Sequence, residues 1–237
     1  MEINSKARTL KNLNIDGVNV PKLKIYSTKN FVLNKNKILN DIKKNFKSSI
    51  AIRSSSYDED QPNKSNAGKY TSFLNVNPKN LNKVKNRIEE VIKSYAKKKL
   101  NSEFFIQEMV KNIKISGVVL TRELESYLPC YNINYYIGKD SSAVTSGKSG
   151  SKNIIYIENK KYKLNSKFEK LVKIIKKIKK KTRELDLDVE FAINKEEKIF
   201  VLQVRRLVTK NISKDLNPKI LFFKLEKKIN KLKKKHY

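Results

Sequence analysis

Apolar side chains recur along this chain at two spacings, one typical of helices and the other of strands. A spacing of three and four residues predicts helices over residues 4–14, 35–47, 79–99 and 166–184. Short apolar or alternating runs predict strands over 20–26, 49–53, 72–76 and 131–137, and pairs of strands within 103–121, 153–164 and 186–206. The apolar faces of the helices are expected to pack on the core.

The last predicted hairpin, at 186–206, separates an apolar face from a polar one. Side chains alternate between the two faces of a strand, so Asp188 and Glu190 point away from the apolar residues between and beside them. If the turn centres between its two glutamates, Glu190 lies opposite Gln203 and Asp188 lies opposite Arg205. A slip of one residue would scramble this pattern, so the pattern itself indicates the register.

The polar face of this hairpin has two interpretations. Magnesium prefers hard oxygen ligands, usually one or two carboxylates beside nucleotide phosphates, and Glu190 and Gln203 would supply such oxygens side by side. Arg205 would then stabilise the charge on a transferring phosphoryl group. The alternative is an ordinary cross-strand ion pair between Asp188 and Arg205, worth about 0.2–1 kcal/mol.

A long polar loop joins the predicted strands 49–53 and 72–76. Arg53 ends the first strand, and serines, clustered acids and Gly68 follow it. A compact fold seldom keeps so long a loop without a use for it. Arg53 offers a planar fork of donors that matches phosphate oxygens, and Gly68 lets the backbone come close to a ligand. The segment therefore predicts an anion-binding site.

The formal net charge of +31, from 54 Lys and Arg against 23 Asp and Glu, suggests nucleic acid or another anionic surface as a partner. The lysines are spread along the whole chain, however, together with many asparagines and isoleucines. This distribution favours a general compositional bias of the sequence, and not a dedicated nucleic-acid-binding site, as the origin of the positive charge. No aromatic RNA-binding motif, helix-turn-helix pattern or zinc-ligand spacing accompanies the charge.

The 237 residues, 38% of them hydrophobic, suffice for one sizeable domain or two small lobes. The single cysteine, Cys130, excludes an internal disulfide and fits a reducing cytoplasm. The N-terminus lacks the apolar core of a signal peptide, and no apolar run approaches the roughly 20 residues that span a bilayer. We therefore expect a cytoplasmic protein without a transmembrane segment.

Three segments, taken in order, resemble the nucleotide-binding domain of the pyruvate phosphate dikinase and phosphoenolpyruvate synthase family. The first begins at Arg53, with R-S-S, then E-D, then S-x-A-G-x-x-x-S-x-L-x-V. The second is I-Q-E-M-V at 106–110 with S-G-V-V-L-T-R at 116–122. The third is D-V-E-F-A-I at 188–193 with L-Q-V-R at 202–205. The predicted helix 4–14, followed by the strand 20–26, resembles the opening of the family domain, so the resemblance runs from about residue 3 to residue 208.

The resemblance implies an α+β protein with the ATP-grasp fold, in which two lobes with mostly antiparallel sheets surround a nucleotide cleft. It places this domain at residues 1–210, with the boundary between the lobes near 105–115. Residues 211–237 would form a basic C-terminal helix or linker. The strand at 131–137 and the loop at 138–151 look more like the compact branch of the family that includes a glutamine kinase.

The ligands implied by the resemblance are ATP and Mg²⁺. The residues that would contact the nucleotide are Lys6, Arg53, Gly68, Gln107, Glu108, Val110, Glu190, Gln203 and Arg205. Among these, Lys6 would meet phosphates, and Arg53 and Arg205 would be catalytic. The metal would be held by Glu190 and Gln203, with Asp188 beside them. Asn4-Ser5 replaces the two glycines that precede Lys6 in the family pattern.

In this family ATP phosphorylates a histidine on a separate domain. The single histidine here, His236, lies in K-K-K-H-Y and lacks the G-G-x-x-[ST]-H context of the carrier histidine. The resemblance therefore implies the ATP-binding module of a kinase-type transferase whose carrier-histidine and acceptor domains lie on a missing segment or another chain. The alternatives are a stand-alone or degenerate nucleotide-binding domain and, of a different class, a basic nucleic-acid-binding protein.

Overall fold

The computed structural model describes residues 1–3, 5–55, 71–95, 102–124, 127–138, 150–158, 164–184 and 186–207. The chain forms two compact units. The first contains residues 1–112 together with 200–204, and the second contains 113–199 together with Arg205 and the residues after it. Each unit has its own sheet.

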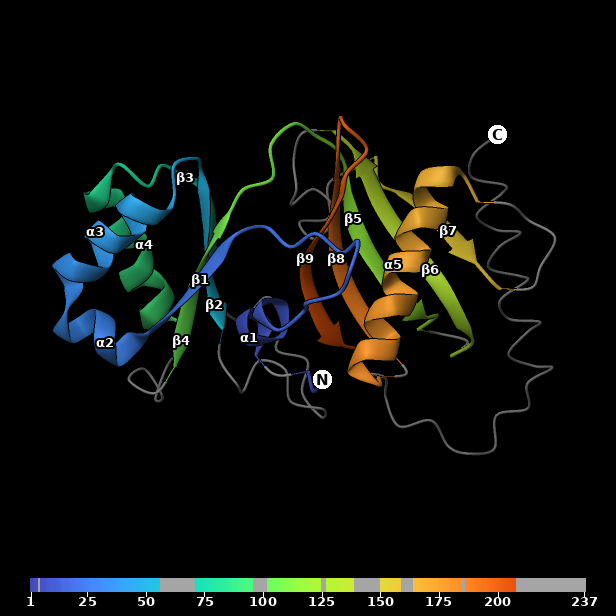
Figure 1. Ribbon diagram of the computed structural model, residues 1–237, viewed down its shortest axis with the longest axis horizontal. Coiled ribbons are helices and arrows are strands. Elements are labelled where there is room, and N and C mark those ends of the chain that lie inside the picture. The colour runs from blue at the N-terminus through green and yellow to red at the C-terminus, as the bar shows by residue number, and fades with distance from the viewer. Residues whose placement is uncertain are drawn as a thin grey trace. The chain divides into compact units, whose positions relative to one another are not determined.

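The first unit is built on a four-stranded sheet in the order β1-β4-β2-β3 (Figure 1). Its strands, all antiparallel to their neighbours, are β1 (Leu23–Ser27), β2 (Ile50–Ser55), β3 (Ser72–Val76) and β4 (Glu103–Glu108). Three helices cover one face: α2 (Thr28–Leu33), α3 (Lys35–Asn45) and α4 (Leu81–Lys93). Their apolar stripes form one core with Ile50 and Ile52 of β2 and with Phe104 and Ile106 of β4.

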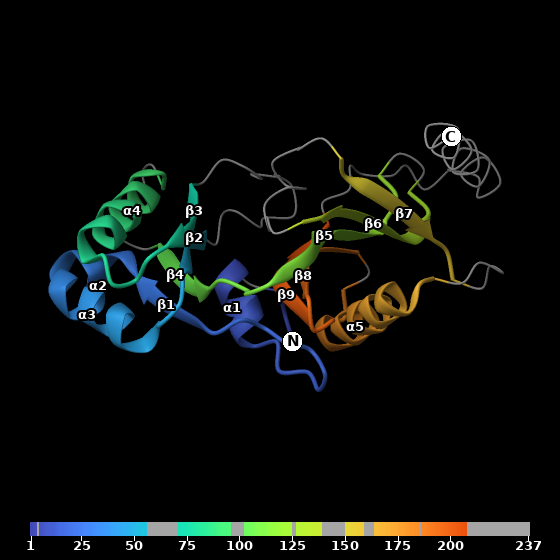
Figure 2. The ribbon, with the colours of Figure 1, turned by 90° about the horizontal axis from the view of Figure 1, so that it is seen from above.

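The opposite face of this sheet carries the short helix α1 (Lys6–Lys11), as Figure 2 shows. Side chains alternate along β2, so Arg53 and Ser55 point away from the helical core that contains Ile52. The hydroxyl of Ser55 accepts a hydrogen bond from Ala7 N–H of α1 at 3.1 Å. The two faces of the sheet are thus both covered, one by three helices and the other by α1.

The second unit is built on a five-stranded sheet in the order β7-β6-β5-β8-β9. The strands of this sheet are β5 (Ile113–Arg122), β6 (Pro129–Ile137), β7 (Lys152–Tyr156), β8 (Leu187–Asn194) and β9 (Ile199–Arg206). Residues 200–204 of β9 are the part of this strand that is grouped with the first unit. Helix α5 (Ser166–Thr182) packs on one face, where the ring of Phe168 lies 4.8 Å from that of Tyr135 on β6. The helix begins after Asn165, whose side chain accepts the Lys167 N–H, and ends at Arg183 in the left-handed conformation.

The register of the β8–β9 hairpin changes by one residue along its length. Near the turn, Asn194 N–H donates to Lys198 O at 3.1 Å. At the open end, Leu207 N–H donates to Asp186 O at 3.0 Å. If the pairing of Asn194 with Lys198 continued unchanged along both strands, Asp186 would lie opposite Arg206. It bonds to Leu207 instead, so the second strand contains one extra residue between the turn and the open end. At the open end, the hairpin therefore has the register predicted from the sequence. Near the turn, the register differs from the predicted one by one residue.

Most of the predicted elements are confirmed, but helix α2 was not predicted. The sequence supplies only one strongly buried apolar residue there, Phe31, which is 1% exposed. A capping hydrogen bond starts the helix, because the Ser27 hydroxyl accepts the Asn30 N–H at 3.1 Å. A helix of six residues with one buried anchor leaves no periodic signal in the sequence.

Several predictions fall outside the described residues. These are Gly68 and the rest of the long loop, the second strand of the hairpin predicted at 153–164, the loop after 138, and the basic C-terminal segment with His236. Among the helices that the structure describes, none is long and apolar enough to cross a membrane.

Candidate functional site

The predicted acidic residues lie on one face of the five-stranded sheet. Asp188 pairs with Leu120 of β5, and Glu190 pairs with Val118. Between them, Val189 is fully buried on the α5 side of the sheet, together with Phe191. The predicted separation of β8 into an apolar and a polar face is therefore confirmed.

Asp188 and Arg205 form an ion pair across the open end of the hairpin. The Nη2 atom of Arg205 lies 2.9 Å from Oδ2 of Asp188, and the two side chains are only 20% and 19% exposed. Such a pair is less screened than one on the open surface, and it fixes the orientation of the guanidinium group. The structure thus brings together two residues that the sequence had placed opposite each other.

Two further arginine–carboxylate pairs lie beside this one, and the sequence did not predict them. Arg122 Nε lies 2.8 Å from Asp186 Oδ2, and Arg206 Nε lies 2.7 Å from Glu184 Oε1. Arg122 also donates to the carbonyl of Tyr127. This end of the sheet is therefore held by alternating positive and negative groups, which sequence spacing cannot pair because the partners come from different strands and loops.

Strand β9 carries two enclosed hydrogen-bond donors without acceptors among the described residues. One is Nε2 of Gln203, whose residue is 4% exposed, and the other is Nε of Arg205. An enclosed donor that makes no hydrogen bond costs about 1–3 kcal/mol, so each such group in a native fold calls for an explanation. Both donors would suit the oxygens of an anion such as a phosphate.

The predicted phosphate-binding residues Lys6 and Arg53 lie in the first unit. Arg53 is on β2, between Phe105 of β4 and Ser72 of β3, and it is half-buried. Lys6 is the first residue of α1, which packs on the same face of the sheet as Arg53. Gly68 lies outside the described residues.

The three residues predicted at the adenine edge follow one another at the end of β4. Gln107 is 2% exposed, and its Nε2 atom lies 3.4 Å from the carbonyl oxygen of Leu202 in β9. Glu108 accepts a hydrogen bond from the Ser48 hydroxyl, and its N–H donates to the carbonyl of Lys22. Val110 follows β4 and is half-buried.

The backbone of this segment is already partly engaged. The N–H groups of Glu108 and Met109 donate to Lys22 O at 2.8 Å and to Ser49 O at 2.9 Å. Any main-chain contact with a base would therefore have to come from carbonyl groups here or from the chain at Val110.

The sequence did not predict two further features, one in each unit. Ser5, directly before Lys6, has a hydroxyl that is enclosed and makes no hydrogen bond to any described residue. Asn132, Asn134 and Asn153 form a cluster on the same sheet face as Glu190, in which Asn153 Nδ2 donates to both other amide oxygens at 2.6 Å. A chain so rich in asparagine gives no sequence signal that singles these three out.

The donor set of the polar face fits a hard cation such as Mg²⁺. Across the part of the chain that the structure describes, no three His, Cys, Asp or Glu side chains gather as a metal-binding group. Asp188 and Glu190 nevertheless stand two residues apart on one strand, both on the same face. Magnesium commonly takes only one or two protein carboxylates and completes its shell with phosphates and water.

Residues 28–146 match the protein family described as "Pyruvate phosphate dikinase, AMP/ATP-binding domain". The match spans half of the chain and covers both the R-S-S strand and the S-G-V strand. This chain belongs to that family. Membership supports an ATP-binding module of the ATP-grasp type. The matched range includes five of the predicted site residues: Arg53, Gly68, Gln107, Glu108 and Val110. Lys6 and the β8–β9 hairpin lie outside it.

Solved structures place the fold of this AMP/ATP-binding domain among ATP-grasp enzymes. The chain is similar to the D-alanine-D-alanine ligase from Coxiella burnetii, with a TM-score of 0.50, 14% identity, and coverage of 92% of this chain and 51% of that one. A second match is D-alanyl-alanine synthetase A from Vibrio cholerae, with a TM-score of 0.49, 12% identity, and coverage of 83% of this chain and 52% of that one. A third is N5-carboxyaminoimidazole synthetase from Staphylococcus aureus complexed with ADP, with a TM-score of 0.47, 14% identity, and coverage of 89% of this chain and 45% of that one. The chain thus spans about half the length of these enzymes. No curated protein sequence matches it.

Proposed function

We propose that this chain is the Mg-ATP-binding module of a phosphotransferase of the phosphoenolpyruvate synthase and pyruvate phosphate dikinase type. Residues 1–210 would form the nucleotide-binding domain. The histidine that receives the phosphoryl group, and the domain that binds the final acceptor, would be supplied by another segment or another chain.

The observation that carries this proposal is the chemistry of the β8–β9 hairpin. Two enclosed donors, Gln203 Nε2 and Arg205 Nε, lie two residues apart on β9. The carboxylates of Asp188 and Glu190 share one face of the neighbouring strand. A hairpin that carries both donors and carboxylates suits a ligand that is itself anionic but carries a cation, and Mg-ATP is such a ligand.

Each hairpin residue has a distinct proposed part in binding. Glu190 and Gln203 would hold the magnesium ion, with Asp188 beside them. When bound, the ion would neutralise part of the phosphate charge. Arg205, oriented by its ion pair with Asp188, would direct its Nε donor at a phosphate oxygen and stabilise charge on the transferring group.

The remaining predicted residues would bind the rest of the nucleotide. Lys6 and Arg53 would contact phosphates from the first unit, and a guanidinium group is well suited to this because its donors form a planar fork. Gln107, Glu108 and the chain at Val110 would bind the adenine edge.

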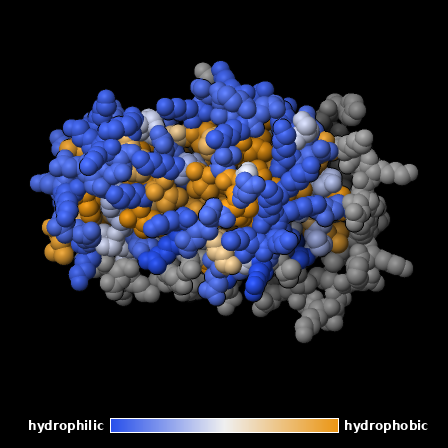
Figure 3. All heavy atoms as spheres, viewed as in Figure 1, coloured by the Kyte–Doolittle hydropathy of each residue, from blue (hydrophilic) through white to orange (hydrophobic). Residues whose placement is uncertain are grey.

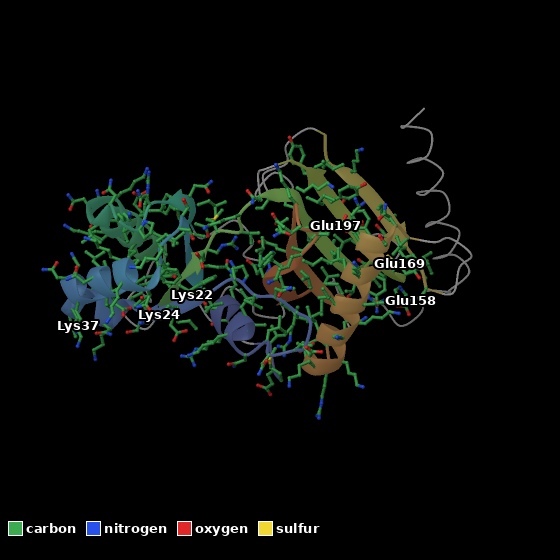
Figure 4. The ribbon with its side chains drawn as sticks, turned by 45° about the horizontal axis from the view of Figure 1, so that its top comes forward. Lys22, Lys24, Lys37, Glu158, Glu169 and Glu197 are labelled. Atoms are coloured by element: carbon green, nitrogen blue, oxygen red, sulfur yellow. The ribbon has the colours of Figure 1, made fainter. Side chains whose placement is uncertain are left out.

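A double variant, Glu190→Ala with Gln203→Ala, tests the assignment. We expect calorimetric binding of ATP in the presence of Mg²⁺ to weaken by at least tenfold, because loss of hydrogen bonds to charged groups costs about 1.5–3 kcal/mol each. The matched control is Glu169→Ala, an exposed acid on α5 (Figure 4). Undiminished binding and ATP consumption in the double variant would contradict the proposal.

A further inference from the structure

Helix α1 is tied by two independent links to the ends of β2 and β4, the two central strands of the first unit's sheet. Ala7 N–H donates to the Ser55 hydroxyl at 3.1 Å. The guanidinium group of Arg8 contacts both carboxylate oxygens of Glu103, at 2.9 and 2.5 Å. Ser55 and Glu103 are themselves paired across β2 and β4. We call Ala7, Arg8, Ser55 and Glu103 the α1 clamp.

The first link replaces the usual cap of a helix. The first N–H groups of a helix have no partner within it and are normally satisfied by the side chain that precedes it. Ser5 occupies that position, but its side chain makes no capping hydrogen bond. The acceptor for the Ala7 N–H comes instead from Ser55, 48 residues after Ala7.

The strand end that receives α1 is held from its other side as well. Ser55 N–H donates to the hydroxyl oxygen of Tyr95 at 3.1 Å, and that hydroxyl donates to the carbonyl of Glu103 at 2.5 Å. Tyr95 is 4% exposed. Because this network joins both strands to the end of α4, the anchor points of α1 are fixed to the core of the unit.

A helix as short as α1 depends on such anchors. Isolated helices of fewer than about 12–15 residues are marginal in water, and α1 has six. Lys6 directly precedes Ala7, and Arg53 lies two residues before Ser55 on the same face of β2. The α1 clamp therefore determines where Lys6 stands relative to Arg53.

We propose that Ser55, Arg8 and Glu103 are positioning residues that hold Lys6 and Arg53 at a fixed separation, so that both contact the phosphate chain of one nucleotide. This inference rests on the proposed function, because it takes Lys6 and Arg53 as phosphate ligands. It adds residues that touch no phosphate themselves and act only through Lys6.

A double-mutant cycle on Ser55 and Lys6 tests this role. In the wild-type background, Ser55→Ala should weaken Mg-ATP binding about fivefold, the equivalent of one lost hydrogen bond of about 1 kcal/mol. In the Lys6→Ala background, the same change should have no further effect. Ser55→Thr, which keeps the hydroxyl, should restore the affinity. The matched control is Ser94→Ala, which removes the C-cap hydroxyl of α4 that donates to Val91 O and is not part of the α1 clamp.

Hydrogen exchange provides a second measurement that needs no nucleotide. The Ala7 amide should be protected in the wild-type protein and should exchange faster in Ser55→Ala and in Arg8→Gln. The control for the ion pair is Arg87→Gln, because Arg87 pairs with Glu90 on α4 at 2.8 Å and does not belong to the α1 clamp.

Three outcomes would overturn the inference. One is a Ser55→Ala effect on affinity that is equally large with and without Lys6. Another is rapid exchange of the Ala7 amide in the wild-type protein. The third is unchanged affinity in Lys6→Ala while the Glu190 and Gln203 double variant loses binding, a result that removes the positioning role but leaves the proposed function intact.

Discussion

Gly117, in the S-G-V segment, shows how a motif residue can be required by packing alone. A Cβ atom at this position would lie 2.2 Å from Asn134 O and 2.9 Å from the Phe191 ring. Gly117 is paired with Tyr135 on one side and with Phe191 on the other. Any side chain would push the central strand away from its neighbours, so the glycine serves the sheet and needs no ligand to explain it.

Gly117→Ala is therefore expected to destabilise the protein by about 1–3 kcal/mol, the usual cost of overpacking a core. Urea unfolding at neutral pH measures this loss. Gly138→Ala is the matched control, because its nearest neighbours are atoms of the half-buried Tyr136 ring, which can rotate away. If both variants were equally stable, the crowding around Gly117 would have to be relieved by a shift of the strands.

Arg205 and Asp188 show that a structural and a functional interpretation can both hold at one residue. The ion pair that the sequence allowed as the alternative is present at 2.9 Å. It uses only part of the guanidinium group, since Nε of Arg205 has no acceptor among the described residues. The pair orients the arginine and leaves a donor that a phosphate would satisfy.

At the scale of elements, β1 is linked to α3 by a small polar network. Lys24 and Tyr26 of β1 both contact the carboxylate of Asp41, at 2.7 and 2.6 Å (Figure 4 labels Lys24). Burial and the hydrogen bond to Asp41 raise the pKa of Tyr26 well above its ordinary value of 10.0. Desolvation would raise the pKa of Asp41, but hydrogen bonds from Lys24 and Tyr26 outweigh it and lower that pKa.

This network predicts a pH dependence of stability. Since the pKa of Asp41 is lowered on folding, its contribution is present above its ordinary value of 3.8 and is lost as the pH falls below that value. Tyr26→Phe should lower the free energy of unfolding by about 1 kcal/mol at pH 7, and the difference from wild type should shrink in acid. At the alkaline end, the contribution of Tyr26 is present below pH 10.0 and is lost as the pH rises further.

Urea unfolding of the two proteins across this pH range measures the effect. Tyr136→Phe is the control, because its hydroxyl bonds to none of the residues that the structure describes. A Tyr26→Phe difference that stayed constant into strong acid would show that Asp41 is not the partner that matters.

For the whole molecule, the dominant quantity is the net charge of +31. Figure 3 shows hydrophilic side chains over most of the viewed face of the described residues, with apolar ones between them. Lysines lie on every helix longer than ten residues, including the outer side of α5, where Lys176 pairs with Glu158 at 2.8 Å. The charge is dispersed and does not gather on one element, which fits a compositional origin.

Binding of nucleic acid is therefore expected to be weak, independent of sequence and sensitive to salt. The affinity for a random DNA duplex should fall by about a thousandfold or more between about 50 and about 200 mM salt, because released counterions drive such binding. Fluorescence anisotropy with two duplexes of unrelated sequence measures it. A tight complex with one of the two that survives at the higher salt would favour the nucleic-acid alternative.

The long periodic elements were predictable because each has an apolar stripe that leaves a repeat in the sequence. Helices α3, α4 and α5 and the β8–β9 hairpin are of this kind. Helix α2 was not predictable, because one buried anchor and a capping hydrogen bond leave no repeat in the sequence. The one-residue register change in β9 was not predictable either, because a local bulge leaves no repeat. Of the candidate site, the sequence predicted the opposition of Asp188 and Arg205, but not the arginine pairs of Asp186 and Glu184.

By itself, the sequence determined the family, the α+β class and the polar face of the last hairpin, because motif order and the alternation of side chains are properties of the chain alone. The tertiary structure decided which groups meet. It alone showed that α1 is capped by Ser55 from a distant strand, that Gly117 is enclosed by Phe191 and a neighbouring backbone, and that two donors on β9 have no acceptor among the described residues. Such contacts depend on the pairing of strands far apart in the sequence, and local spacing carries no record of them.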